Sequence, residues 1–225
     1  MRVSIPDSLA RFVTDCLVWY KVLVPKDGTA TRERILDAAE HLVIENGYAA
    51  TSVDQVLAAA STSKGAFFHH FASKLDLGRA LVERYAAADL EHLEQALAET
   101  ASVVDPRERA LAFVRVFEDS ADELMSAQSS CLYVAALTER QLVGAGTGEP
   151  IEKAVEAWRE GYADLLRAAL GRRTARVDAD ALADHLFVTF EGAFLLCRAT
   201  GDPSHMRRQL STYRTLVEAV LAQLP

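Results

Sequence analysis

The sequence is poor in the residues that interrupt helices. Its 225 residues include only 11 glycines and 6 prolines, and runs of β-branched residues are scarce. Alanine and leucine are abundant, and both have a high intrinsic helix propensity. We therefore expect an all-α protein. Half of the residues are hydrophobic, which is enough to bury a sizeable core in one large domain or two small ones.

Cysteines and long apolar runs are scarce as well. Cys16, Cys131 and Cys197 are far apart and form no C-x-x-C pair, so we interpret them as reduced thiols. The apolar segment 16–24 is too short to span a bilayer. It also lacks the basic region and the cleavage site of a signal peptide. We expect a soluble, cytoplasmic protein with no membrane partner.

Motifs of enzymes and metal sites are missing. The sequence contains no G-x-S-x-G, no P-loop, no H-x-x-x-H and no H-E-x-x-H. The adjacent His69 and His70 lie on different faces of a helix and make no metal pair. Residues 144–148 contain several glycines, as a nucleotide-binding loop does. They follow a predicted helix rather than a strand, so the evidence for such a loop is weak. We predict no catalytic residue, metal or cofactor; a helical-bundle enzyme without DNA binding is the alternative.

Helix start and stop signals recur along the chain. Pro and Gly in residues 24–29 separate an N-terminal extension, 1–27, which we expect to be dispensable. Thr51 and Asp54 have the spacing of a capping box before a short helix, and Ser73 and Asp76 repeat it before a long one. Pro106 suits a first helical turn. The predicted helices are 31–46, 52–60, 63–71, 73–99, one from Pro106, an apolar segment 131–143, 151–170, 178–200 and 204–223.

Acidic residues are absent between Asp54 and Asp76, although the chain has 32 of them and a formal net charge of −8. A short helix, a tight turn and a second short helix here precede a long helix. This is the layout of a helix-turn-helix, whose second helix enters the DNA major groove. Phe67 and Phe71 are four apart and both point inward. The spacing of these residues alone does not distinguish a DNA-binding motif from three ordinary core helices with a solvated face. The basic residues of the gap are Lys64, His69, His70 and Lys74.

Residues 31–77 resemble the DNA-binding domain of the TetR family of bacterial transcriptional regulators. The matching elements are RILDAA, GY-ATSV (47–53), A-STSKG (60–65) and HHF-SK (69–74), in family order and spacing. The resemblance implies a helix-turn-helix DNA-binding domain at 28–85, with the motif itself at 52–71. A helical-bundle ligand-binding and dimerisation domain is then expected at 86–225.

The resemblance also implies which residues contact DNA. Two positions depart from the family pattern: Ala66 replaces a residue that is often polar, and Phe68 replaces a residue that is most often Tyr. Phe68 lacks one phosphate-bonding hydroxyl, and Ala66 can contact a thymine methyl but cannot hydrogen-bond a base edge. We expect DNA binding to survive; a module that has lost it is an alternative. The implied contacts are Thr51 as the helix cap, Ser63, Lys64, Gly65, Ala66, Phe68, His69, His70 and Lys74.

Aromatic residues at helical spacing recur after residue 86, and they suit a core as well as a pocket between helices. Glu191 is the one charge in FVTFEGAFLLC (187–197), so we expect it to have a partner: Arg198, a helix terminus or a cationic ligand. Oxidation of Cys131 or Cys197 is an alternative signal to a ligand. The tentative ligand-binding set is Phe113, Phe117, Tyr133, Trp158, Tyr162, Phe187, Phe190 and Glu191.

Two long, largely apolar helices end the chain. In the resembling family such helices form a four-helix dimer interface, so the resemblance implies a homodimer through residues 178–223. Gly192 and Ala193 are small enough for close helix approach. The implied partners are double-stranded, pseudo-palindromic operator DNA and a small-molecule effector of unknown identity. The resemblance further implies that the effector releases a repressor from its operator.

Overall fold

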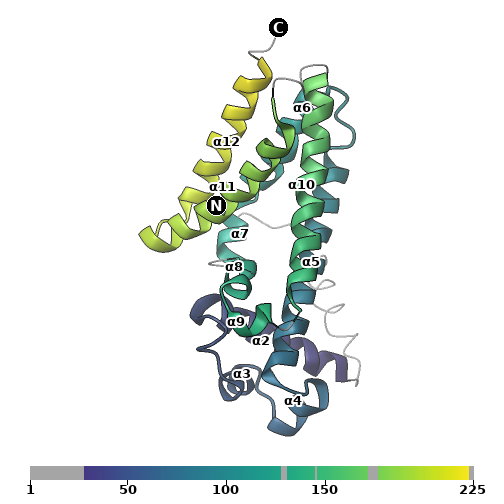
Figure 1. The fold of residues 1–225 in the computed structure, drawn as a ribbon. Coiled ribbons are helices and arrows are strands. Elements are labelled where there is room, and N and C mark those ends of the chain that lie inside the picture. Colours follow the sequence, from purple (N-terminus) through teal and green to yellow (C-terminus); the bar gives the residue numbers. More distant parts are fainter. Residues whose placement is uncertain (1–27, 128–130, 145, 172–176, 223–225) are drawn as a thin grey trace, which may run out of the picture.

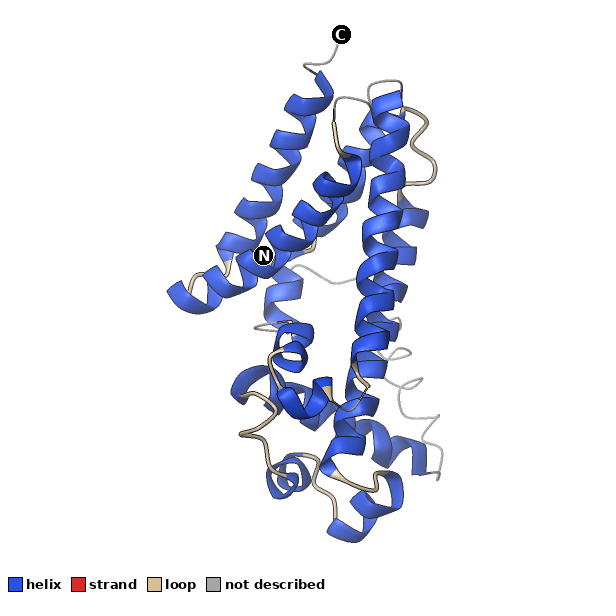
Figure 2. Cartoon of the chain, viewed as in Figure 1, coloured by secondary structure: helices blue, strands red, loops and turns tan. Residues whose placement is uncertain are grey.

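The computed structural model describes residues 28–127, 131–144, 146–171 and 177–222, and within these ranges the only regular elements are helices. This confirms the all-α prediction (Figure 2). The predicted N-terminal extension, 1–27, lies outside the described residues. No helix in the described part of the chain is long and apolar enough to cross a membrane.

One end of the molecule is built from short helices. It consists of α2 (Gly28–Asn46), α3 (Val53–Ala59) and α4 (Lys64–His70), followed by the start of α5 (Lys74–Glu99). Figure 1 shows α3 and α4 at this end, with α5 running away from them into the rest of the fold. The predicted helix-turn-helix layout is confirmed, with α3 and α4 as its two short helices, and so is the length of the following helix.

The rest of the described chain is a helical bundle. Its members are α6 (Pro106–Asp119), α7 (Ala121–Ala127), α8 (Leu132–Leu137), α9 (Arg140–Val143), α10 (Gly148–Leu170), α11 (Ala179–Thr200) and α12 (Ser204–Ala222). Helix α10 packs against α5, α6 and α11, and α12 packs against α6 and α11. Figure 1 shows α5 and α10 side by side, with α11 and α12 forming the opposite wall.

Several helix boundaries differ from the predicted ones. The apolar segment 131–143 is not one helix, because α8 ends at Leu137 and α9 starts again at Arg140. Helix α10 begins at Gly148, before the predicted start at residue 151. Helix α12 begins at Ser204 as predicted, and the Ser204 N–H donates to Asp202 Oδ1 (3.0 Å). The first turn at Pro106 is confirmed, with Asp105 as the N-cap.

The two halves of the molecule share one hydrophobic core. A boundary at residues 85/86 falls inside α5, which is continuous across it, so the division into 28–85 and 86–225 stays a prediction about roles. Helix α8 packs against α2 and α5, and α9 packs against α5 and α8. Leu142 of α9 and Tyr48 are both buried against Gly78 of α5, which ties the bundle to the short helices.

Candidate functional site

Serine caps start both short helices. Ser63 accepts a hydrogen bond from the Ala66 N–H (3.2 Å) at the start of α4. Ser52 accepts from the Gln55 N–H (3.2 Å), and the Gln55 side chain accepts from the Ser52 N–H in return (2.7 Å). Backbone N–H groups remain unpaired in the first turn of a helix and favour anions.

The cap predicted at Thr51 is wrong, because α3 starts one residue later. Thr51 is buried, and its hydroxyl donates to the carbonyls of Leu42 (3.2 Å) and Gly47 (2.9 Å). Its side chain therefore holds the end of α2 in place instead of facing outward. The capping box predicted with Asp54 is likewise replaced by the pair Ser52 and Gln55.

Helix α4 has one buried face and one exposed face. Phe67 and Phe71 are buried, with ring centroids 5.6 Å apart, which confirms that they point inward. Phe68 is 50% exposed although it is a large apolar residue. Ala66 and His70 are half-buried at the sides. The exposed residues of α4 are Lys64, Gly65, Phe68 and His69.

Gly65 has no packing reason to lack a side chain. A Cβ built on it meets nothing nearer than Ser63 Oγ at 3.9 Å. Glycine in a helix is disfavoured relative to alanine. Because Gly65 has no side chain, another molecule can approach the backbone of α4 closely at this position.

Lys74 is engaged within the protein. Its ammonium donates to the Ala49 carbonyl (3.3 Å) and lies 4.4 Å from the centroid of the Tyr48 ring. Burial lowers its pKa from the usual value. Lys74 therefore joins the start of α5 to the turn before α3, and a phosphate contact there stays a prediction.

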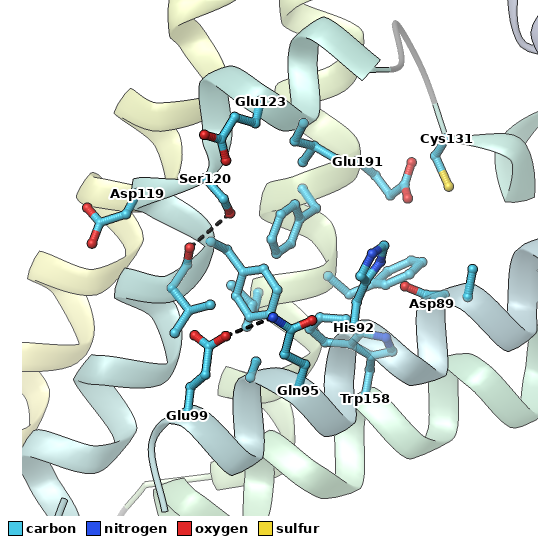
Figure 3. A pocket seen from close by; sticks show the side chains of 18 of the residues that line it. Asp89, His92, Gln95, Glu99, Asp119, Ser120, Glu123, Cys131, Trp158 and Glu191 are labelled. Carbon is cyan, nitrogen blue, oxygen red and sulfur yellow. Dashed lines mark hydrogen bonds between the residues drawn. The ribbon is translucent and has the colours of Figure 1, made fainter. Parts of the chain in front are cut away.

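A cavity of about 1160 Å³ lies among α5, α6, α7, α10 and α11. Its walls are largely apolar and aromatic, and Figure 3 shows polar side chains pointing into it from several of these helices. A volume of this size admits a drug-sized organic molecule. Members of the tentative ligand-binding set that line it are Phe117, Tyr133, Trp158, Phe187, Phe190 and Glu191.

Phe113 and Tyr162, from the same tentative set, do not line the cavity. Their rings stack on each other with centroids 5.1 Å apart, and both residues are fully buried. They belong to the core between α6 and α10. Phe117, one turn after Phe113, lines the cavity, and its ring packs against the Trp158 ring.

Asp89 of α5 lines the cavity, and sequence reasoning missed it. Tyr133 Oη donates to its carboxylate (2.9 Å), and the indole N–H of Trp158 lies nearby without a hydrogen bond of normal geometry. Burial raises the pKa of Asp89, and the hydrogen bond from Tyr133 partly offsets this. Asp89 stands among other acidic residues in α5, so no feature of the sequence distinguishes it.

Glu191 does not pair with Arg198. The Arg198 guanidinium donates to the carbonyls of Ile44 (3.1 Å) and Glu45 (2.8 Å), at the end of α2. Glu191 lies beside the Cys131 thiol, and Figure 3 shows the two side chains pointing toward each other. Burial raises the pKa of Glu191; the hydrogen bond from Cys131 lowers it, and the nearby Asp89 raises it further.

The two described cysteines are buried. Burial and the neighbouring Glu191 raise the pKa of the Cys131 thiol far above its usual value. The thiolate is the reactive form, so this environment makes Cys131 a poor nucleophile. Cys197 Sγ lies 3.5 Å from the Pro203 carbonyl. This geometry favours a structural role for both over thiol sensing.

The outer faces of α11 and α12 carry exposed apolar side chains. Val188 and Leu195 of α11 are 57% and 70% exposed, and Leu216 of α12 is 53% exposed. Gly192 lies on the same exposed side, with nothing within 4 Å of a built Cβ. Ala193, predicted to share that surface, is buried in the core instead. Exposed apolar surface of this kind is typical of protein–protein interfaces.

Two family profiles match the chain. The profile described as "Bacterial regulatory proteins, tetR family" matches residues 35–81, from within α2 into α5. The profile described as "Tetracyclin repressor-like, C-terminal domain" matches residues 106–213, from α6 into α12. The first covers the helix-turn-helix and the second covers most of the bundle.

Individual relatives span both halves. The chain is 32% identical over 188 residues to the transcriptional regulator AcuR of Cereibacter sphaeroides, which covers 80% of this chain and 83% of the relative. The crystal structure of regulatory protein TetR from Rhodobacter sphaeroides has a TM-score of 0.64 and 27% identity, over 81% of this chain and 96% of that one. A TetR transcriptional regulator from Chloroflexus aurantiacus has a TM-score of 0.67 and 25% identity, over 85% and 96%.

Proposed function

Because the chain belongs to the TetR family of bacterial transcriptional regulators, we propose that it is a homodimeric repressor that a small molecule releases from its operator. Family membership makes it a DNA-binding regulator and supports a regulatory role rather than an enzymatic one. The observation that carries the proposal is the exposed face of α4. That face holds no acidic residue, in a chain with formal net charge −8.

The exposed face of α4 is proposed to enter the major groove. Ser63, Lys64 and Gly65 lie in its first turn, where an ammonium and free N–H groups suit phosphate. Ser52 takes over the phosphate contact expected at Thr51, because Ser52 is the cap of α3. Phe68 and Ala66 supply apolar contacts to thymine methyl groups. His69, His70 and Lys74 complete the proposed surface.

A homodimer through residues 178–223 is proposed from the exposed apolar residues of α11 and α12. A two-fold dimer presents two copies of α4 to successive major grooves, which requires an operator with pseudo-palindromic symmetry. The exposed side chains Val188, Leu195 and Leu216 support this interface.

The cavity in each protomer is proposed to bind the effector. Helix α5 forms one of its walls and begins at Lys74, directly after the helix-turn-helix, so a ligand there can change the position of α4. Arg198 gives a second connection, since it joins the end of α11 to the end of α2.

DNA binding is tested by selecting sites from a random duplex library with the full chain. We expect an enriched site with two-fold symmetry. Lys64→Ala should weaken binding to it and reduce the slope of log affinity against log salt by about 0.9. Lys153→Ala is the matched control, because Lys153 is an exposed lysine of α10. Failure to enrich any symmetric site, or equal effects of the two variants, would contradict the proposal.

A further inference from the structure

Two carboxylates in the cavity wall are partly buried and have no cation paired with them among the described residues. Asp89 enters from α5 and Glu191 from α11, and neither forms an ion pair with any described residue. Figure 3 shows Asp89 beside Trp158, and Glu191 beside Cys131. Both carboxylates are largely withdrawn from solvent, where an unpaired charge is unfavourable.

The arginines that line the cavity are already paired with other carboxylates. Arg84 binds Glu33, Asp37 and Glu40 of α2. Arg115 pairs with Glu108 (3.5 Å), and Arg159 pairs with Asp184. His92 is the remaining nearby cation when protonated, and it is exposed. An anionic ligand would therefore find no free arginine here and would face two carboxylates.

Aromatic rings surround these carboxylates. The rings of Tyr85 and Tyr133 meet edge to face at 5.0 Å next to Asp89. The Trp158 ring packs against Phe117 at 5.1 Å. Aromatic faces attract cations through the ring quadrupole, and they also pack against the apolar part of a ligand. The cavity thus combines negative charge with apolar walls.

Resting on the proposed effector role of this cavity, we propose that the effector is an organic amine, whose protonated nitrogen lies between Asp89 and Glu191 and whose apolar body packs on the aromatic wall. The ammonium donates hydrogen bonds to both carboxylates, of which Asp89 also accepts from Tyr133 Oη (2.9 Å) and Glu191 lies beside the Cys131 thiol. Burial of both carboxylates supports this, because burial raises their pKa values and a bound cation would lower them again.

The test compares three probes that share one apolar body: naphthylbutylamine, naphthylbutanol and naphthylbutanoic acid. Each is titrated into the full chain by isothermal calorimetry near neutral pH. We expect the amine to bind at least about tenfold tighter than the alcohol, the gain from charge-assisted hydrogen bonds. The acid should bind weakest. Equal affinities for amine and alcohol, tighter binding of the acid, or no saturable amine binding would overturn the proposal.

Matched variants test which carboxylates bind the ammonium group of the ligand. Asp89→Asn and Glu191→Gln should each reduce the preference for amine over alcohol by about tenfold. Glu123→Gln is the control, because Glu123 lines the same cavity but is exposed. If Asp89→Asn fails to fold by circular dichroism, Glu191→Gln decides alone. An unchanged preference in Glu191→Gln, or an equal loss in Glu123→Gln, would overturn the assignment.

Operator binding, measured on the same protein preparations, distinguishes failure of this proposal from failure of the proposed function. A wild-type chain that binds a symmetric operator but shows no amine preference would refute the amine and leave the regulator intact. A chain that prefers the amine but binds no symmetric DNA would refute the proposed function and support the ligand class.

Discussion

A substitution at Gly65 should change stability and DNA binding in opposite directions. We expect Gly65→Ala to raise the free energy of unfolding by up to about 1 kcal/mol, because alanine is the better helix former and the added methyl meets nothing closer than 3.9 Å. The same methyl should weaken operator binding, since it lifts the surface of α4 from the DNA backbone.

Gly148→Ala is the control for this pair of measurements. Gly148 also lies in the first turn of a helix, α10, with nothing within 4 Å of a built Cβ. Thermal unfolding should show a gain for both variants, whereas a fluorescence-anisotropy titration should show weaker DNA binding for Gly65→Ala alone. Unchanged operator affinity in Gly65→Ala would mean that α4 does not approach DNA through this residue.

Glu191 should make stability depend on pH. Burial raises its pKa in the folded state, so the folded carboxyl holds its proton more tightly than the unfolded one. Stability is therefore lost as pH rises from the usual carboxyl range through the raised value. The groups facing Glu191 are Cys131 and Asp89, and neither is a cation.

Glu191→Gln removes the loss of stability at higher pH, because glutamine does not ionise. We expect the variant to be more stable than the wild type above the raised pKa, and equal to it at low pH. Urea unfolding at a series of pH values measures the difference. Glu123→Gln, an exposed residue, should follow the wild-type curve. A Glu191→Gln curve parallel to the wild type would show that Glu191 is not buried as described.

At the scale of elements, Gly78 is where α5, α9 and the turn at Tyr48 meet. A Cβ on Gly78 would lie 2.6 Å from Leu142 Cδ2 and 2.9 Å from Tyr48 Cε2, both too close. We expect Gly78→Ala to lower the free energy of unfolding by about 1–3 kcal/mol, the usual effect of overpacking.

A double-mutant cycle tests this contact. Leu142→Ala removes the nearest clashing atoms, so Gly78→Ala should be less destabilising in that background than alone. Urea unfolding of the four proteins gives the interaction free energy. Strictly additive effects would show that α9 does not pack on α5 through these residues.

The helices were predictable where local signals agree with packing. Phe67 and Phe71 are four apart, and both are buried; Pro106 lies in the first turn of α6 as expected. Thr51 and Ser52 are both good caps and adjacent, so the sequence could not choose between them. The choice comes from a distant contact, the bond from Thr51 Oγ1 to the Leu42 carbonyl.

The cavity was predictable only in part, for the same reason. Phe113 and Phe117 lie one turn apart on α6 and have the same chemistry, and only the packing of α10 buries the first in the core. Asp89 resembles the exposed acids around it in α5. It becomes a cavity residue because α8 brings the Tyr133 hydroxyl against it.

At the scale of the whole molecule, the proposed dimer should depend on Leu195. We expect Leu195→Glu to give a monomer, because a charge would enter the centre of an apolar interface. Operator affinity should then fall by about a hundredfold or more, since one molecule no longer holds both half-sites. Val104→Glu is the control: Val104 is 94% exposed and lies after α5. Sedimentation of Leu195→Glu as a dimer would refute this interface.

The last prediction concerns communication between the cavity and α4. The two copies of α4 must be about 34–36 Å apart to enter successive major grooves. Helix α5 extends from the end of the helix-turn-helix, at Lys74, past Asp89 in the cavity wall. A ligand that draws Asp89 toward Glu191 moves α5, and therefore changes the separation of the recognition helices.

Such coupling must act in both directions. A coupling free energy of about 1–3 kcal/mol gives a 5- to 150-fold loss of operator affinity, and operator DNA must weaken ligand binding by the same factor. The measurement is a pair of calorimetric titrations of naphthylbutylamine, into free protein and into protein saturated with operator. A duplex with scrambled half-sites is the control and should leave amine affinity unchanged. Equal amine affinities with and without operator would mean that α5 transmits no signal, because a ligand that binds two states equally cannot shift their populations.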